Sequence, residues 1–298
     1  MRCSIIIPTY NRRDSLRRCL AAVTRQDHPD FEVIVVDDAS TDGTGDMVQR
    51  EFPHVRCLRQ DINTGSTIAR NNSISMCGGD LVVFTDDDCI PPAHWLRTHV
   101  AHYADPRVGV VGGPLITAAP SFCDKFYAAH YRDEYERLQR IEHLAGWERL
   151  VTGNMSVPRA VFERVGLFDG EFPRGADADL VRRICRAGYV VIADPAVAVE
   201  HLKSYTLRSF LLERFAKACG SMMTDVKEGS LSVRRFVPLP NVVGTWRDWQ
   251  NFRAMFGAPF AVSLPFWTLA IVTRWLEVAG RGYYYWTVGR FYRAGKSS

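Results

Sequence analysis

The feature that most constrains the fold of this chain is a pair of short apolar runs that each stop at a cluster of aspartates. Phe31–Val36 ends at Asp37-Asp38, and Leu81–Thr85 ends at Asp86-Asp87-Asp88. Near-continuous apolar runs of this length are typical of parallel strands buried on both faces of a sheet. We therefore predict an α/β protein whose acidic clusters lie at the carboxyl ends of two buried strands, where open α/β sheets bind their ligands.

Strands and helices are expected to alternate along the first third of the chain, which predicts a doubly wound, mainly parallel sheet. Pro8 is expected to end the first strand, because proline cannot donate to a ladder. A long charged stretch, Cys123–Arg149, is expected to be helical. The predicted strands are Cys3–Ile7, Phe31–Val36, Val55–Leu58, Leu81–Thr85 and Val108–Val111, and the predicted helices are Ser15–Arg25, Thr44–Glu51 and Ser66–Met76.

Composition narrows the class of protein. With 298 residues, 47% of them hydrophobic and 23% charged, the chain is able to bury a large core, which excludes disordered and fibrous classes. Its eight cysteines include no C-x-x-C pair, so a reducing cytosol fits better than a disulfide framework or a zinc site. Met1–Tyr10 has no basic n-region or small-residue cleavage site and is expected to be a strand rather than a signal peptide.

Three consecutive carboxylates at the end of a buried strand repel one another, so a cation or a set of strong donors is expected beside Asp86-Asp87-Asp88. Hard oxygen ligands favour Mg²⁺ or Mn²⁺, ions that commonly share their coordination with substrate phosphates. A solvated acidic turn is the alternative.

Asp37-Asp38 is suited to accept hydrogen bonds from a base or ribose, although a plain turn also explains it. Arg70 is either a base or phosphate contact or a surface charge.

An ordered series of motifs resembles the family 2 glycosyltransferases, inverting enzymes of the GT-A fold that use nucleotide-sugars. The resemblance covers residues 3 to about 203, and its order and spacing make it far more specific than any single motif. The matching segments are Ser4–Asn11, Val35–Thr44, Asn63-x-Gly65 with Ala69-Arg70-Asn71, Phe84–Asp88 containing D-x-D, Gly153-Asn154-Met155, Val165-Gly166-x-Phe168-Asp169, Asp177-x-Asp179-Leu180-x-x-Arg183 and Ala187-Gly188-Tyr189.

The resemblance implies a role for each matched residue. Asp177 falls where the family places its general base. Asp88 is implied to be the principal metal ligand, with Asp86 and His201 at the same Mn²⁺ or Mg²⁺ ion. The nucleotide contacts implied are Pro8, Tyr10, Asp38, Arg70, Asp86 and Asp87.

Two positions depart from the family pattern. Ala176 stands where the family usually has Glu, and Cys89 where many members carry another Asp. His201 matches a position near the metal and diphosphate, with a structural histidine as the alternative. Trp147 and the Gly153-Asn154 turn are candidates for shaping the sugar and acceptor pocket, and core packing is the alternative for Trp147.

Asp177 is expected in the first turn of a helix, because Gly175 precedes it and Leu180, Val181 and Ile184 follow with helical spacing. The positive end of a helix favours an ionised carboxylate, as a base requires. An N-cap without a catalytic role is the alternative. Asp179 is a rival base that would point to a different face of the helix.

The C-terminal part has a different character from the rest of the chain. Residues 236–298 contain seven basic and two acidic side chains, a net charge of +5, and 15 of the chain's 34 aromatic residues. No charge occurs between Arg253 and Arg274, although Pro259 and Pro265 interrupt this stretch. Interfacial helices on an anionic membrane are expected, with a spanning helix and an aromatic core or oligomer interface as alternatives.

We expect three segments: residues 1–115 as the nucleotide-sugar-binding half, 116–235 as the acceptor-binding half of the same GT-A domain, and 236–298 as a helical, membrane-associated extension. The predicted activity is transfer of a sugar, from a UDP-sugar by default, to a hydroxyl of a glycan or lipid-linked acceptor at the cytoplasmic face of a membrane. No nucleic-acid partner is expected. The alternatives are a nucleotidyltransferase, a phosphatase with an Asp nucleophile, and a membrane-bound module that senses nucleotide-sugar without turnover.

Overall fold

A computed structural model describes residues 1–117, 121–130, 142–144, 150–172, 174–229, 242–257 and 260–289. The chain divides into two compact units. The sheet unit comprises residues 1–118, 137–170 and 176–203, and the helical unit comprises residues 119–136, 171–175 and 204–298. The three functional segments expected from the sequence stay a prediction.

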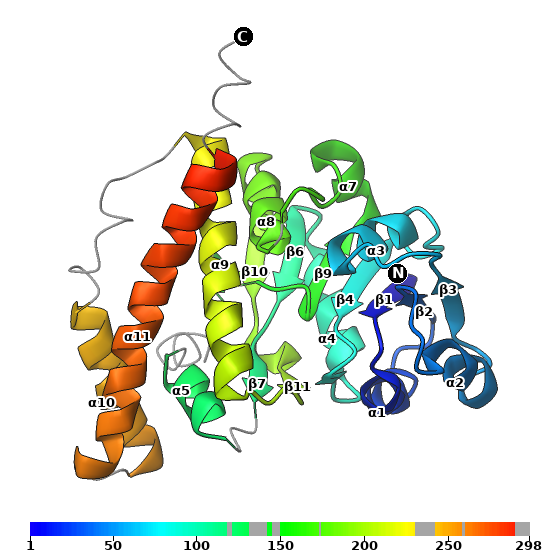
Figure 1. The fold of residues 1–298 in the computed structure, drawn as a ribbon. Helices are drawn as coiled ribbons and strands as arrows, with labels where there is room; N and C mark the ends of the chain where they lie inside the picture. Colours follow the sequence, from blue (N-terminus) through cyan, green and yellow to red (C-terminus); the bar gives the residue numbers. More distant parts are fainter. Residues whose placement is uncertain are drawn as a thin grey trace. The chain divides into compact units, whose positions relative to one another are not determined.

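The main sheet of the sheet unit has the strand order β3-β2-β1-β4-β9-β6-β10-β8 among the described residues. Strands β1, β2, β3 and β4 pair in parallel, as do β6 and β10, whereas β9 runs antiparallel to β4 and β6 (Figure 1). The bounds are β1 Cys3–Thr9, β2 Phe31–Asp37, β3 Arg56–Arg59, β4 Leu81–Thr85, β6 Val108–Gly112, β8 Glu142–Leu144, β9 Asn154–Pro158 and β10 Val190–Ala193. The predicted mixed, mainly parallel sheet is confirmed.

Helices cover both faces of this sheet, as a doubly wound fold requires. Side chains of one face, among them Ile5, Ile7 and Val83, pack against α1, α2 and α4. On the other face Phe84 makes edge contacts with Phe162 and Phe168, in and just after α7. Every residue of β1 and β4 is buried, which explains why both read as unbroken apolar runs. The helices are α1 Arg13–Val23, α2 Thr44–Glu51, α3 Ser66–Ile74, α4 Trp95–Ala101, α7 Arg159–Val165 and α8 Ala176–Arg186.

A second, three-stranded sheet lies in the same unit, with the order β5-β11-β7. Its strands are β5 Cys89–Ile90, β7 Leu115–Thr117 and β11 Val199–His201, and short 3₁₀ turns occur at His102–Ala104 and Pro195–Val197. Cys89 of β5 pairs with His201 of β11. This small sheet therefore joins the end of the acidic turn to a residue more than a hundred positions further along the chain.

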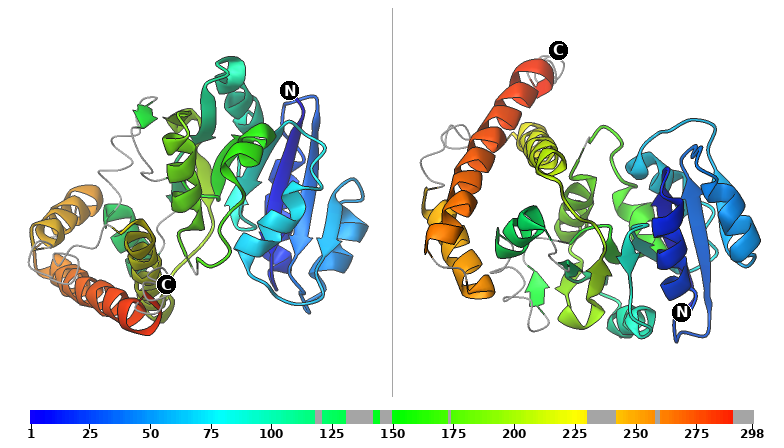
Figure 2. Two further views of the ribbon diagram at one scale, coloured as in Figure 1. Left: turned by 90° about the horizontal axis from the view of Figure 1, so that it is seen from above. Right: turned by 60° about the horizontal axis from the view of Figure 1, so that its bottom comes forward.

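The helical unit contains α5 Phe122–His130, α9 Leu207–Glu228, α10 Val242–Phe256, α11 Phe260–Tyr284 and a π-helical turn at Tyr285–Gly289. Helices α9 and α11 lie side by side (Figure 1, Figure 2), and a Cβ on Gly280 of α11 would lie 2.8 Å from the carbonyl oxygen of Phe215 in α9. Only glycine permits this approach. An aromatic core fills the space between α5, α10 and α11, where Phe126, Phe252 and Phe266 are in ring contact. The predicted helical C-terminal extension is confirmed.

Three predictions about elements were wrong. Strand β1 does not end at Pro8 but continues to Thr9. The pairing of β1 with β4 stops at Ile6 and Phe84, so Pro8 has a paired strand, β2, on one side only. A proline is tolerated there because it is not required to donate to a second strand. The stretch predicted as one helix over Cys123–Arg149 contains α5 and the strand β8, and its other residues lie outside the described ranges. Pro265 lies inside α11 instead of ending it, and Pro259 lies outside the described residues.

Candidate active site

Three strands deliver the predicted site residues to one edge of the main sheet. Thr9 at the end of β1 pairs in register with Asp37 at the end of β2, and Asp86 directly follows β4. Because β1, β2 and β4 are parallel, their carboxyl ends meet at the same edge. The prediction that both acidic clusters lie at the carboxyl ends of buried strands is confirmed.

Two arginines neutralise the acidic turn. Arg12 Nη1 lies 3.0 Å from Asp87 Oδ1 and 2.7 Å from Asp88 Oδ2, and Arg70 Nη2 donates to Asp86 Oδ1 at 2.5 Å. Arg70 is 6% exposed, so it is not a surface charge. Asp87 also accepts a 2.7 Å hydrogen bond from the Thr9 hydroxyl. The set of strong donors expected beside three adjacent carboxylates is therefore present.

Asp87 and Asp88 differ in electrostatic environment. Burial raises the pKa of Asp87 to about 6, even though Arg12 and Thr9 favour its charged form. Burial also acts to raise the pKa of Asp88, but His201 and Arg12 outweigh it and lower that pKa to about 2. Asp88 is thus the carboxylate of the pair that stays ionised at any physiological pH, which suits a cation ligand.

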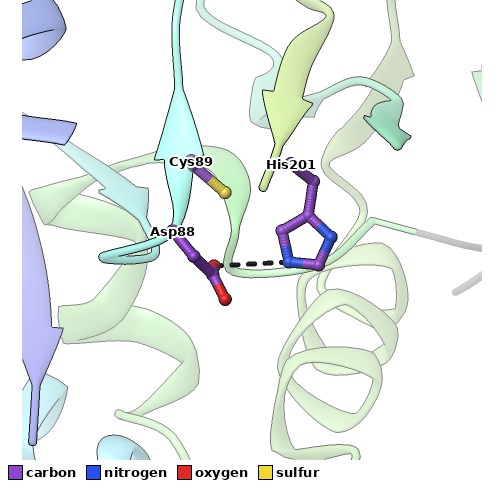
Figure 3. Close-up of side chains that lie close together, drawn as sticks. All are labelled: Asp88, Cys89 and His201. Carbon is purple, nitrogen blue, oxygen red and sulfur yellow. Dashed lines mark ion pairs between the residues drawn. The ribbon is translucent and has the colours of Figure 1, made fainter. Parts of the chain in front are cut away.

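Asp88, Cys89 and His201 place one potential ligand atom each within 4.8 Å of one another. Figure 3 shows the Asp88 carboxylate and the His201 ring pointing toward each other, with 3.3 Å between Asp88 Oδ1 and His201 Nε2. An oxygen and an imidazole nitrogen suit Mn²⁺ and are compatible with Mg²⁺. Burial raises the pKa of the Cys89 thiol well above its usual value, so without a cation beside it this group is a neutral thiol.

Asp86 lies outside this group of potential ligands. Its carboxylate pairs with Arg70 in α3, and the small residue Gly153 leaves room for it, because a Cβ at Gly153 would lie 3.2 Å from Asp86 Oδ2. The structure therefore brings Asp88 and His201 together as metal-ligand candidates and places Asp86 with Arg70. The role of Asp86 at the metal stays a prediction.

Arg12 is the site residue that sequence reasoning missed most clearly. It precedes α1, and its side chain is 47% exposed while its guanidinium bridges two buried carboxylates. A partly exposed arginine beside a predicted metal site is well placed to meet the oxygens of a diphosphate. A basic residue in the loop after the first strand was the available signal, but its partners lie 75 and 76 residues away in sequence.

Asp38 is buried and orders a neighbouring loop. Its Oδ1 accepts hydrogen bonds from the Thr64 amide at 2.8 Å and the Gln60 side chain at 2.7 Å, and its Oδ2 accepts from the Gly65 amide at 2.8 Å. Gly65 has a φ of +85°, a conformation that glycine adopts most readily. Asp38 thus fixes the loop that carries Asn63-x-Gly65, and its predicted contact with the base stays a prediction.

The loops after β1 and β2 are tied together and hold a strained backbone. Asn11 donates its amide to Ser40 Oγ at 2.9 Å and accepts from the Thr41 amide at 2.7 Å. Among described residues, Asn11 at φ +52° and Ala39 at φ +66° are the two non-glycine residues with positive φ. Such strain persists where the surroundings determine the conformation, and it concentrates at ligand sites.

The two other predicted nucleotide contacts differ in access. Tyr10 lies at the start of the loop after β1 and is 47% exposed, whereas Pro8 is buried within β1. Tyr10 is accessible to a ligand, and Pro8 shapes the strand beneath it.

Asp177 is the second residue of α8, as predicted, and follows Gly175 at φ +90°. Its Oδ1 accepts from the Ala178 amide at 2.9 Å, and the Thr152 backbone also donates to it. The charges of Arg70 and Asp86 act on Asp177, which places it beside the acidic turn. Burial raises its pKa, a shift that Ala178, Arg70 and Thr152 oppose. A carboxylate with a raised pKa is better matched to accept a proton near neutral pH.

Asp179, the rival base, has a different partner. It forms a 2.8 Å salt bridge with Arg183 one turn along α8, and Arg183 in turn donates to the carbonyl oxygens of Val165 and Leu167. These contacts hold α8 against the segment after α7. Trp147, a candidate from the sequence for shaping the sugar and acceptor pocket, lies outside the described residues.

Asn154 connects the two sheets behind the site. Its Nδ2 donates to the carbonyl oxygens of Pro114 and Val197, which precede β7 and β11, at 3.2 and 2.8 Å. Its Oδ1 accepts from Trp95 Nε1 at 2.8 Å and lies 3.3 Å from His99 Nε2. Burial lowers the pKa of His99 to about 3, so this ring stays neutral and is part of the support.

The fold and the site together define a GT-A glycosyltransferase, and the sequence profile of glycosyl transferase family 2 matches residues 4–164. The chain belongs to this family. Membership decides against the nucleotidyltransferase and phosphatase alternatives.

Curated relatives of this chain are named as glycosyltransferases. Glycosyltransferase AglE of Haloferax volcanii is 33% identical over 191 residues, 62% of this chain and 62% of the relative. The pre-mycofactocin glycosyltransferase of Mycobacterium tuberculosis is 27% identical over 225 residues, 71% of this chain and 45% of the relative. The matched part of the chain thus spans less than two thirds of either relative.

Two solved structures are similar in fold. The mannosyltransferase PcManGT from Pyrobaculum calidifontis, in complex with GDP-Man and Mn²⁺, superposes with a TM-score of 0.69 at 22% identity, over 96% of this chain and 88% of that one. S. aureus TarS 1-349 in complex with UDP gives a TM-score of 0.55 at 17% identity, over 99% and 92%. These similarities establish the fold and show that it accommodates nucleotide ligands.

Proposed function

We propose that this chain transfers a sugar, with inversion, from a nucleotide diphosphate-sugar to a hydroxyl group of a glycan or lipid-linked acceptor, with the help of Mn²⁺ or Mg²⁺. The observation that carries the proposal is the Asp88–His201 pair, an ionised carboxylate and an imidazole 3.3 Å apart at the carboxyl end of a buried strand. The complexes of the fold relatives with GDP-Man and Mn²⁺ and with UDP support a donor of this class.

On the donor side, Asp88 and His201 would hold the ion, which when bound supplies positive charge beside the departing diphosphate. Arg12 and Arg70, which pair with the acidic turn, are two further cationic groups at the same edge. Asp38, with the loop it orders, and Tyr10 are proposed to contact the base and ribose. The two fold relatives hold different nucleotides, so a UDP-sugar is the first donor to test and a GDP-sugar the second.

On the acceptor side, Asp177 would accept the proton of the attacking hydroxyl. The acceptor oxygen forms a bond to the anomeric carbon while the bond from that carbon to the diphosphate oxygen breaks, and the electron pair of the broken bond leaves on the diphosphate. The amide donors of Ala178 and Thr152 orient the Asp177 carboxylate for this step. The resulting sugar has the opposite anomeric configuration to the donor.

The test is donor turnover by purified full-length protein with Mn²⁺ and a panel of UDP- and GDP-sugars. Slow release of nucleotide diphosphate together with free sugar supports the transferase, because water substitutes for the acceptor. Binding of a nucleotide-sugar without any turnover, even with candidate glycan acceptors present, favours the sensing module and contradicts the proposal. Thermal shift with each donor identifies which nucleotide-sugar to use.

A further inference from the structure

Helix α11 presents an uncharged, mainly apolar face to solvent. Ile271, Val272, Trp275 and Tyr283 are 38%, 41%, 58% and 59% exposed, Ala279 between them is exposed, and Trp286 in the following turn is 64% exposed. Trp275 lies four positions after Ile271 and three after Val272, and the later members follow at steps of four, four and three, so the six residues form one stripe on the helix. We call this stripe the α11 face. It is about 22 Å long at 1.5 Å per residue.

The charged residues of α11 are on its opposite, inner side. Glu277 is 6% exposed and pairs with Arg214 of α9, while Arg274 bridges Glu277 and Asp248 of α10 at 3.3 and 3.1 Å. Arg281 lies 3.8 Å from the same Glu277 carboxylate. A surface helix of a globular protein normally turns its charged side chains to solvent, whereas α11 buries them on the same side as its core residues Phe266 and Leu269. The α11 face is therefore suited to a surrounding that is less polar than water.

Among the described residues of the helical unit, most exposed charged side chains are basic. Among acidic residues of the helical unit whose side chains are described, only Glu171 is exposed, while Asp124, Asp225, Asp248 and Glu277 are buried. Arg208 at the start of α9 and Arg247 and Arg253 of α10 are exposed. Such a surface attracts anionic lipid, whereas two copies of it would bring like charges together.

We propose that the α11 face docks on the surface of an anionic lipid bilayer, with its aromatic side chains at the level of the headgroups. Tryptophan and tyrosine combine an apolar ring with a polar group and favour this depth. No helix among the described residues is long and apolar enough to cross a bilayer, which fits a helix that lies on the surface. The sequence predicted membrane association from composition alone; the structure identifies the face.

Flotation of the full chain with vesicles tests this inference independently of turnover. Wild-type protein should float with vesicles of phosphatidylcholine and phosphatidylglycerol and float less with phosphatidylcholine alone. The double variant Ile271→Glu/Trp275→Glu should reduce the bound fraction at least tenfold, because it places two carboxylates on the α11 face. The matched control is Met76→Glu/Leu167→Glu, which replaces two exposed apolar residues of the sheet unit with the same change in charge and should float like wild type.

Both variants alter exposed side chains, and circular dichroism and Tm check that they fold. The proposal is wrong if wild-type protein stays unbound with both vesicle types, or if the α11 variant floats as well as wild type. It is also wrong if wild-type protein does not float and is a dimer that the α11 variant converts to a monomer, since a second copy then covers the face. A failure of donor turnover with normal flotation contradicts only the proposed function.

Discussion

At the scale of single residues, Asp88 is expected to be the carboxylate on which metal dependence rests. Asp88→Asn removes a charged ligand from the proposed ion site and should lower donor turnover about a hundredfold or more, equivalent to about 3 kcal/mol of transition-state stabilisation. The assay is nucleotide diphosphate release across a Mn²⁺ titration. Asp46→Asn, an exposed aspartate in the first turn of α2, is the matched control and should behave like wild type. Equal rates in EDTA and in Mn²⁺ would contradict the metal assignment.

Asp177 is expected to act in the chemical step rather than as a support for α8. Asp177→Asn should reduce kcat about a hundredfold or more, with donor binding nearly unchanged. Because burial raises the pKa of Asp177, its charge costs stability at neutral pH, so the variant should lose no thermal stability. A pure capping role predicts near-normal kcat, and because asparagine caps a helix about as well as aspartate, it also predicts little loss in the free energy of unfolding. Steady-state kinetics of the variant therefore separate the two roles, and thermal unfolding checks that the variant is folded.

The raised pKa of Asp177 also predicts the direction of a pH effect. A base works only when ionised, so kcat should fall as pH decreases through the folded-state pKa, at a pH above the 3.8 of an ordinary aspartate. Asp87 is a second buried carboxyl with a raised pKa, so the variant Asp87→Asn is the control. The remaining activity of this variant should still fall at low pH if Asp177 is the group that titrates. If the fall at low pH disappears in Asp87→Asn, the titrating group is Asp87 instead.

Sequence alone located the residues that stand at strand ends and missed those defined by contacts across the chain. Asp86-Asp87-Asp88 was found because the end of an apolar run marks where a buried strand ends. Asp177 was found through the resemblance to the family motif, and helical spacing then placed it in the first turn of a helix. Arg12 and Asn154 were not assigned their contacts, because their partners are fixed only when distant segments meet. Cys89 was noted as a departure, and only the fold shows that its thiol lies beside Asp88 and His201.

At the scale of elements, the small sheet that carries His201 depends on Asn154. Asn154→Ala leaves the carbonyl oxygens of Pro114 and Val197 without their side-chain donor, so β7 and β11 lose a common anchor. We expect a lower Tm and, since His201 is on β11, a several-fold higher Mn²⁺ concentration for half-maximal turnover.

Ser156→Ala is the control for this effect. The Ser156 hydroxyl hydrogen-bonds to His99, which also lies beside Asn154, and to the hydroxyl of Tyr103, a residue of the 3₁₀ turn His102–Ala104. These two hydrogen bonds do not involve β7 or β11. Ser156→Ala should lower Tm without changing the Mn²⁺ dependence. The same Mn²⁺ shift in both variants would show a general loss of stability and not a positioning role for Asn154.

Helices α9, α10 and α11 are held by buried charges as well as by aromatic contacts. Glu277→Gln removes the carboxylate shared by Arg214, Arg274 and Arg281 and leaves buried positive charge uncompensated. We expect a loss of about 3 kcal/mol or more in the free energy of unfolding. Glu51→Gln, at the exposed Arg17–Glu51 pair, should change stability little. Chemical denaturation with helix and aromatic signals measures both, and equal effects would contradict the importance of the buried network.

At the scale of the whole molecule, the sheet unit could be predicted from sequence more fully than the helical unit. Parallel strands buried on both faces leave a strong apolar signal, and β4 and α2 were predicted with their observed bounds. In the helical unit the pattern is mixed, since Arg274 and Glu277 of α11 are turned inward together with core residues such as Phe266, while Trp275 is turned outward. Periodicity indicates that such a helix exists, but only the packed structure shows which side faces its neighbours.

The hydrogen bonds of Asp38 have a thermodynamic consequence for the first step of catalysis. The Thr64 and Gly65 amides are already held by this carboxylate, so the loop between β3 and α3 is ordered before any ligand arrives. A donor that binds beside an ordered loop loses its own freedom of motion but does not have to immobilise the protein as well. Donor binding should therefore reduce the conformational entropy of the polypeptide only slightly. The entropy loss from ordering this loop occurs when the protein folds.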